Sequence, residues 1–161
     1  MKNTIIIALL ILVACKQAKR EGQVLPDFDL LLVDSVTKLN TASIPEGHPV
    51  VLLYFSPDCE HCQKETEGIL KKMDSLQHVQ FYFITNDSLV RLQVYNYMYK
   101  LYKYPNITLG RDYKYFFPAH FKDAAPPTMV IYDKDKMLVT IIKGEIDSSQ
   151  IMSSISNINT Y

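Results

Sequence analysis

The apolar residues of this chain fall into short runs that are separated by polar breaks, as expected when strands alternate with helices. Residues 50–55 form the clearest run, with the length and composition of a strand buried on both faces, and residues 79–85 form a second. Between them, residues 60–76 are predicted to be a helix, because their apolar positions recur at helical spacing. This order predicts a βαβ unit with parallel strands and a right-handed crossover.

Shorter patterns on either side complete the prediction of an α/β protein. Residues 28–33 and 36–39 flank Asp34-Ser35 and predict an N-terminal hairpin. Asn86-Asp87-Ser88 is an N-cap signal for a helix over residues 89–102, which Pro105 is expected to end. The remaining expected elements are a short strand at 107–109, an aromatic stretch at 113–121, a hairpin of strands 128–132 and 137–142, and a final helix from 148 to about 158.

The first fifteen residues have the pattern of a signal peptide. Lys2 precedes an apolar segment, residues 5–13, which is too short to span a bilayer as a helix. The segment ends in Leu12-Val13-Ala14-Cys15, which resembles the lipobox of bacterial lipoproteins, where the cysteine is lipidated after cleavage. An ordinary signal peptide or a buried apolar helix is the alternative. We therefore expect a signal peptide over 1–15, a polar tether over 16–23 and one domain over 24–161.

Charge and cysteine content narrow the function. Lysine plus arginine equals aspartate plus glutamate at 17 each, so no basic excess indicates nucleic acid, and membrane attachment is expected through lipid alone. The chain has three cysteines, so Cys59 and Cys62 remain as a pair if Cys15 carries lipid. Export implies an oxidising compartment, in which such a pair stays oxidised unless electrons are supplied.

Cys59-Glu60-His61-Cys62 lies where the 50–55 strand gives way to the 60–76 helix. The first thiol is then at a helix N-terminus, where unpaired N–H groups and the helix dipole favour the thiolate. The second sulfur lies one turn away, within reach of a disulfide. The motif therefore predicts reversible dithiol–disulfide exchange.

Residues 24–158 resemble the thioredoxin superfamily, specifically the exported TlpA/ResA-type thiol–disulfide oxidoreductases. The resemblance is carried by Leu25-Pro26-Asp27-Phe28, by residues 54–62 around the cysteines, and by Pro126-Pro127-Thr128. It implies a thioredoxin-like fold with a central mixed sheet, helices on both faces and the N-terminal hairpin as an extension. It also implies that Cys59 is the nucleophile, that Cys62 is the resolving thiol, and that Pro127 is cis and faces the disulfide, in a substrate-binding loop with Pro126 and Thr128. No cofactor is implied beyond the redox-active disulfide.

Glu65 corresponds to the glutamate that follows the motif in many ResA-like proteins, where it is thought to assist proton transfer. It lies three residues after Cys62 and so on the same helical face. A solvated carboxylate that pairs with Lys64 or Lys72 is the alternative, and the sequence leaves the two open.

Three positions depart from the family. Leu53 stands where thioredoxins have a buried carboxylate and ResA-like chains a polar residue, so proton handling is expected to fall to Glu65, Asp58 or water. Asp58 replaces the usual aromatic residue, and a nearby anion disfavours the Cys59 thiolate. Pro126 has no N–H to offer to an extended substrate, which removes one hydrogen bond, net ~1 kcal/mol.

The residues that tune the redox pair oppose one another. His61 matches the position at which the strong oxidant DsbA has a thiolate-stabilising histidine, but histidine is only partly protonated at neutral pH. Glu60 and Asp58 act in the opposite direction. We therefore expect a reduction potential between the reducing and the strongly oxidising extremes, of undetermined direction.

These observations predict a periplasmic, lipid-anchored and monomeric thiol–disulfide oxidoreductase that reduces disulfides of exported proteins. Its expected partners are those proteins and a membrane thiol protein that donates electrons. Lys16 after Cys15 favours the outer membrane, by resemblance to known sorting.

The alternatives are a DsbA-like oxidant or isomerase, a copper-binding chaperone that uses both thiols and His61, a peroxide-reducing relative with Ser56, and a structural disulfide. No bound metal is expected, and His48, His78 and His120 are expected at the surface. The tyrosines of 95–121 are expected mostly in the core, with a few as a partner-binding patch.

Overall fold

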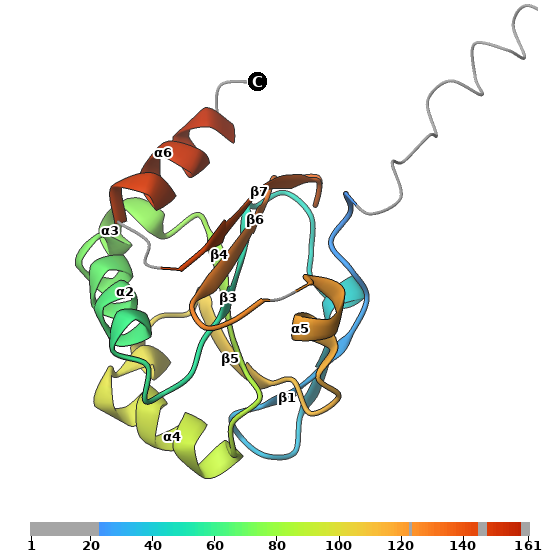
Figure 1. Ribbon diagram of the computed structural model, residues 1–161. Coiled ribbons are helices and arrows are strands. Elements are labelled where there is room, and N and C mark those ends of the chain that lie inside the picture. Colours follow the sequence, from blue (N-terminus) through green and yellow to red (C-terminus); the bar gives the residue numbers. More distant parts are fainter. Residues whose placement is uncertain (1–22, 123, 145–147, 159–161) are drawn as a thin grey trace, which may run out of the picture.

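A computed structural model describes residues 23–122, 124–144 and 148–158. Its centre is a 7-stranded mixed sheet with the strand order β2-β1-β5-β4-β3-β6-β7 (Figure 1). The strands are β1 (Asp29–Leu32), β2 (Lys38–Asn40), β3 (Val50–Tyr54), β4 (Gln80–Thr85), β5 (Ile107–Arg111), β6 (Thr128–Tyr132) and β7 (Leu138–Lys143). The expected signal peptide with Cys15, and residues 16–22 of the expected tether, lie outside the described residues. Gln23, the last tether residue, already joins the fold, because its carbonyl accepts a 2.6 Å hydrogen bond from the Leu138 N–H.

The predicted βαβ unit is confirmed and extends further than expected. Strands β3, β4 and β5 are mutually parallel neighbours, so two successive crossovers build the middle of the sheet. Both predicted hairpins are also confirmed. The β1–β2 hairpin joins antiparallel to β5, and β6 joins antiparallel to β3. Of the β6–β7 hairpin, only β7 lies at an edge of the sheet.

Helices cover both faces of the sheet, as predicted. One face carries α2 (Glu60–Lys71), α3 (Met73–Leu76), α4 (Leu89–Met98) and α6 (Ser148–Ile158), and the other carries α5 (Phe116–His120) (Figure 1). Two 3-10 turns, η1 (Thr41–Ser43) and η2 (Leu101–Lys103), complete the described elements. Side chains of β3 alternate between the two apolar cores, because successive residues of a strand point to opposite faces. Val51 and Leu53 join the core beneath α2, whereas Val50 and Leu52 join the core beneath α5.

Two predicted helices end earlier than expected. The helix predicted over 60–76 is interrupted at Lys72, whose φ of −109° and ψ of 7° leave the helical region before α3 begins. The helix predicted over 89–102 ends at Met98, because Lys100 adopts a left-handed φ of 53°. Pro105 is therefore not what ends it. The turn at Lys100 delivers Leu101 into the core, where it is fully buried, and burial of an apolar side chain offsets the cost of the turn.

Strand β3 leads directly to the Cys59 segment. Its last residue, Tyr54, lies opposite Thr128 at the start of β6, so the chain before Cys59 and the Pro126-Pro127 segment converge at one end of the sheet. None of the helices in the described part of the chain is both long and apolar enough to cross a membrane.

Candidate active site

Cys59 and Cys62 lie at the start of α2, as the sequence predicts. Cys59 is the N-cap, and its Sγ accepts a hydrogen bond from the Cys62 backbone N–H at 3.2 Å. Its own N–H donates to the Ser56 carbonyl at 3.1 Å, which fixes the turn between β3 and α2. Cys59 is half-buried and Cys62 is fully buried, and both are free thiols in this structure. A backbone donor aimed at Sγ at a helix start stabilises a thiolate, so the geometry suits Cys59 for nucleophilic attack.

Cys62 has the properties of a thiol that must be deprotonated before it reacts. Burial raises the pKa of the Cys62 thiol far above its usual range, and the neighbouring Cys59 and the charge of Glu65 raise it further. The backbone N–H of Ser56 acts in the opposite direction and is outweighed. Cys62 therefore stays protonated at neutral pH, and attack by its sulfur requires a proton acceptor.

Glu65 is buried, with only 4% of its surface exposed, and neither carboxyl oxygen has a hydrogen-bond partner. Burial raises the pKa of Glu65 from 4.5 to about 8. The alternative of a solvated carboxylate paired with a lysine is therefore wrong for this residue. Its charge acts on the Cys62 thiol, so the structure brings the two together as the family resemblance implies.

Leu53 is fully buried in the same apolar core as Cys62. The sheet therefore offers a hydrocarbon surface to the resolving thiol at the position where related chains have a polar residue. A low-polarity surface of this kind disfavours charge on Cys62, in agreement with the direction of its pKa shift.

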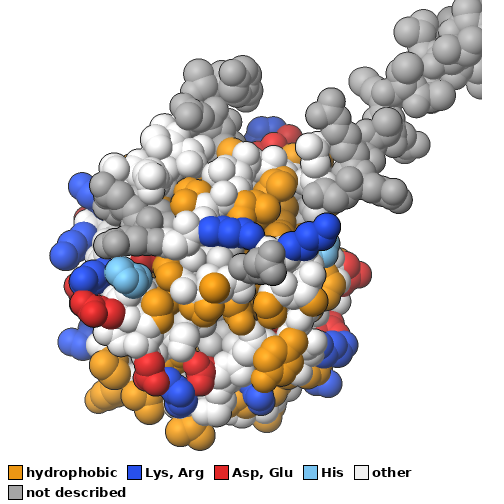
Figure 2. Space-filling view, viewed as in Figure 1, with side chains coloured by type: hydrophobic (Ala, Val, Ile, Leu, Met, Phe, Trp, Pro, Cys, Tyr) orange, Lys and Arg blue, Asp and Glu red, His pale blue; other side chains and the backbone are white. Residues whose placement is uncertain are grey.

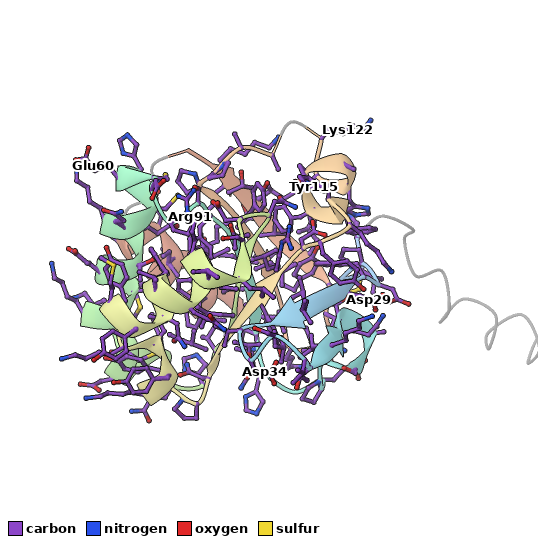
Figure 3. All side chains as sticks on the ribbon, turned by 90° about the horizontal axis from the view of Figure 1, so that it is seen from below. Asp29, Asp34, Glu60, Arg91, Tyr115 and Lys122 are labelled. Atoms are coloured by element: carbon purple, nitrogen blue, oxygen red, sulfur yellow. The ribbon has the colours of Figure 1, made fainter. Side chains whose placement is uncertain are left out.

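The two acids that were expected to disfavour the Cys59 thiolate are both paired with cations. Arg91 of α4 forms an ion pair with Asp58 and a second one with Asp87, whose oxygen is 3.0 Å from the guanidinium. Glu60 pairs with Lys64 at 2.9 Å, and the hydrogen bond and charge of Lys64, with a smaller effect of His61, lower the pKa of Glu60. Figure 3 shows Glu60 and Arg91 on α2 and α4 at the same side of the molecule. The expected effect of Asp58 and Glu60 against the Cys59 thiolate is therefore weakened by these ion pairs.

Sequence reasoning missed Arg91, which also ties the active-site turn to α4. Asp87, one of its partners, accepts a 3.1 Å hydrogen bond from the Ser56 hydroxyl. The four-residue spacing between Asp87, just before a predicted helix, and Arg91 in its first turn was a signal for an ion pair. Nothing in the sequence indicated that Arg91 would also reach Asp58.

Replacing Arg91 by glutamine is expected to slow alkylation of Cys59 by iodoacetamide about twofold at neutral pH. The change removes a cation and leaves Asp58 and Asp87 uncompensated, and effects of exposed charges are small. The rate would be measured by mass spectrometry on the reduced protein, with Lys103→Gln, an exposed cation on η2, as the matched control. Arg91→Gln combined with Asp58→Asn should recover part of the loss, and an unchanged rate in Arg91→Gln would contradict the expectation.

The Pro126–Pro127 peptide bond is cis, as predicted for Pro127. Pro127 is buried, Pro126 is exposed, and the Pro127 carbonyl accepts a 3.0 Å hydrogen bond from the Gly144 N–H. Thr128 is buried, and its hydroxyl donates to the Ala125 carbonyl at 2.7 Å. The loop is thus held by its own hydrogen bonds beside the segment that leads to Cys59. Substrate binding by Pro126, Pro127 and Thr128 stays a prediction.

The other histidines are exposed, as expected: His48, His78 and His120. Within the described ranges, no three His, Cys, Asp or Glu side chains are grouped so that they could hold a metal ion.

The tyrosines divide between core and surface. Tyr95 is buried, whereas Tyr97, Tyr102 and Tyr115 are exposed. Apolar side chains at the lower left of Figure 2 lie over α4, whose exposed members include Val90, Val94 and Met98.

Solved structures described as thiol–disulfide proteins are similar to this chain. A secreted disulfide oxidoreductase of Mycobacterium tuberculosis, described as homologous to E. coli DsbE, superimposes with a TM-score of 0.69 at 19% identity, over 87% of this chain and 99% of that one. A candidate protein disulfide isomerase from Bacteroides thetaiotaomicron gives 0.66 at 23% identity over 87% and 88%. A candidate thiol:disulfide interchange protein DsbE from Chlorobium tepidum gives 0.65 at 18% over 85% and 96%.

No protein-family model and no curated protein sequence matches the chain. The structural similarity confirms that the chain has a thioredoxin-like fold.

Proposed function

We propose that this protein is a thiol–disulfide oxidoreductase that reduces disulfides of exported proteins through Cys59 and Cys62. One observation carries the proposal. The Cys59 sulfur lies at the start of α2 with a backbone N–H on it, while the buried Cys62 thiol lies one turn deeper beside the buried Glu65. This arrangement separates an accessible nucleophile from a protected resolving thiol with a nearby proton acceptor.

Reduction of a substrate then takes two displacements. The Cys59 thiolate attacks one sulfur of the substrate disulfide, whose S–S bond breaks, and the other substrate sulfur leaves as a thiolate that is protonated by solvent. Cys62 passes its proton to the Glu65 carboxylate and attacks the Cys59 sulfur. The bond between Cys59 and the substrate breaks, the second substrate thiolate leaves, and it is protonated in turn. The substrate gains two electrons and two protons, and the protein is left with a Cys59–Cys62 disulfide.

The reducing direction is supported by the state of Cys62. A couple becomes a strong oxidant when its reduced form is specially stabilised as a thiolate. Here the buried resolving sulfur is held as a neutral thiol, whereas the pairing of Asp58 and Glu60 with cations weakens their effect against the Cys59 thiolate and so acts toward the oxidising direction. The reduced form therefore carries at most one thiolate, at Cys59. The electrons come back from an external dithiol, and the redox-active disulfide itself is the only cofactor that the proposal requires.

The proposed location is the periplasm, with the chain anchored by lipid on Cys15 and the outer membrane favoured. The lipobox-like ending of residues 1–15 and the position of Lys16 support this location. The description of the M. tuberculosis protein of the same fold as secreted agrees with export. The proposed partners are exported proteins with disulfides and a membrane thiol protein that donates electrons, and the chain acts as a monomer.

The reduction potential of the Cys59–Cys62 pair tests the direction. The protein would be equilibrated in dithiothreitol redox buffers, and the fraction of alkylated thiols would be counted by mass spectrometry. We expect a potential nearer to the value of thioredoxin, about −270 mV, than to that of DsbA, about −120 mV. A value at the DsbA end would reverse the proposed direction while leaving the exchange chemistry in place.

A further inference from the structure

Tyr95 of α4 reaches across to the turn of α2 that holds the resolving cysteine. Its hydroxyl forms hydrogen bonds there. Its side chain is 2% exposed, although its helical neighbours Val94 and Tyr97 are exposed. The ring packs against Phe55 at a centroid distance of 4.7 Å and against Tyr99 at 4.6 Å. Phe55 directly follows β3, so Tyr95 is wedged between the end of that strand and the helix of the cysteines.

The Tyr95 hydroxyl closes a small polar triangle around the Cys62 backbone. Its oxygen is 2.7 Å from the Thr66 Oγ1 and 3.4 Å from the Cys62 carbonyl oxygen. The Thr66 hydroxyl donates to the same carbonyl at 2.9 Å. Because Thr66 gives its hydrogen to the carbonyl, the Tyr95 hydrogen points to the Thr66 oxygen or to the carbonyl. In both cases it points toward the turn that contains Cys62.

Cys62 and Glu65, which exchange a proton in the resolving step, both act electrostatically on this hydroxyl. Burial raises the pKa of Tyr95 strongly, against the effect of the Thr66 hydrogen bond, so the phenol stays neutral. The titratable groups that act on it are Tyr99, the C-cap residue of α4, and Cys62 and Glu65 of α2. The apolar Phe55, which follows β3, also packs against the ring. A neutral donor that points toward Cys62 stabilises negative charge on that side more than the neutral form.

From this geometry we infer that Tyr95 is a positioning residue for the resolving step. Its hydroxyl, together with Thr66, holds the Cys62 turn and favours the anionic states of Cys62 and Glu65, between which the proton moves. The inference rests on the proposed function, because it concerns the second displacement only. Attack by Cys59, which lies outside the triangle, is unaffected.

The two displacements can be followed separately with dithiobis(nitrobenzoate), which releases one coloured thiolate when Cys59 attacks and a second when Cys62 resolves the mixed disulfide. In Tyr95→Phe we expect the second release to be about fivefold slower at pH 7, as for the loss of one hydrogen bond, and its pH midpoint to move upward. The first release should keep its wild-type rate. The phenylalanine ring preserves the contacts with Phe55 and Tyr99.

Thr66→Val should reproduce the defect of Tyr95→Phe through a different helix, and Thr66→Ser, which keeps the hydroxyl, should not. Tyr99→Phe is the matched control, since it removes a hydroxyl from the neighbouring ring outside the triangle, and both of its releases should match those of the wild type.

Three results would overturn the inference. They are a wild-type pH profile for the second release in Tyr95→Phe, an equal slowing of both releases, and an equal effect of Tyr99→Phe. A wild-type protein that gives the first release and never the second contradicts the proposed function itself, so the two failures are distinguishable.

Discussion

Replacement of Cys59 by serine is expected to abolish disulfide exchange, with a loss on the order of 10³-fold or more. A serine hydroxyl is not ionised near neutral pH and cannot form the mixed disulfide through which exchange proceeds. The N-cap hydrogen bond to the Cys62 N–H can still be made by the serine oxygen, because serine is a favoured N-cap residue. The fold should therefore survive, and the loss should be chemical. Reduction of insulin in the presence of dithiothreitol, followed by the turbidity of the precipitating chains, measures it.

Cys62→Ser is the matched variant, because it removes the resolving thiol and keeps the nucleophile. We expect it to attack the substrate at nearly the wild-type rate and then to accumulate a stable mixed disulfide, visible by mass spectrometry as one substrate thiol added per chain. Full insulin reduction by Cys59→Ser would refute the assignment of Cys59 as nucleophile. A mixed disulfide that accumulates on Cys62 in Cys59→Ser, with none on Cys59 in Cys62→Ser, would reverse the two roles.

The parts of the site that could be predicted from sequence are the local ones. The Cys59-Glu60-His61-Cys62 motif and its place between a strand and a helix depend on residues adjacent in the chain, whereas the cis bond before Pro127 was expected from the family resemblance. The succession of strands along the chain followed in the same way from runs of apolar residues, because each run is long enough to fix one buried strand.

What the sequence left open depends on contacts between distant segments. Whether Glu65 is solvated depends on which side of α2 faces the sheet, and the sequence pattern of the helix allows both. Arg91 neutralises Asp58 only because α4 lies beside the start of α2. The same holds for Tyr95, because nothing in the sequence of residues 89–102 distinguishes the tyrosine that faces Cys62 from the tyrosines that are exposed to solvent. Such pairings are decided by packing and not by local propensity.

The stability of the reduced protein is expected to fall as the pH rises from 5 to 8, and Glu65 is the cause. Its carboxyl has a pKa of about 8 in the folded chain and an ordinary value of 4.5. Below pH 4.5 both the folded and the unfolded chain hold the proton, so Glu65 contributes nothing. Above it, the unfolded chain releases the proton while the folded chain keeps it, which favours unfolding increasingly until the folded group also ionises. The full penalty reaches about 5 kcal/mol, since each unit of difference in pKa is worth about 1.4 kcal/mol.

Glu65→Gln removes this titration while keeping the shape of the side chain. Denaturant unfolding under reducing conditions should give similar free energies of unfolding for the two proteins at pH 5 and a variant that is more stable by several kcal/mol at pH 8.5. Glu67→Gln, an exposed position on the same helix, is the control and should keep the wild-type slope. In Glu65→Gln, the rate of the resolving step should no longer rise with pH, because the carboxylate that accepts the Cys62 proton is absent. If the free energy of unfolding of the wild type did not change from pH 5 to pH 8.5, Glu65 would have to be solvated or paired. Glu65 could not then be the protected proton acceptor that the proposed reduction of substrates requires.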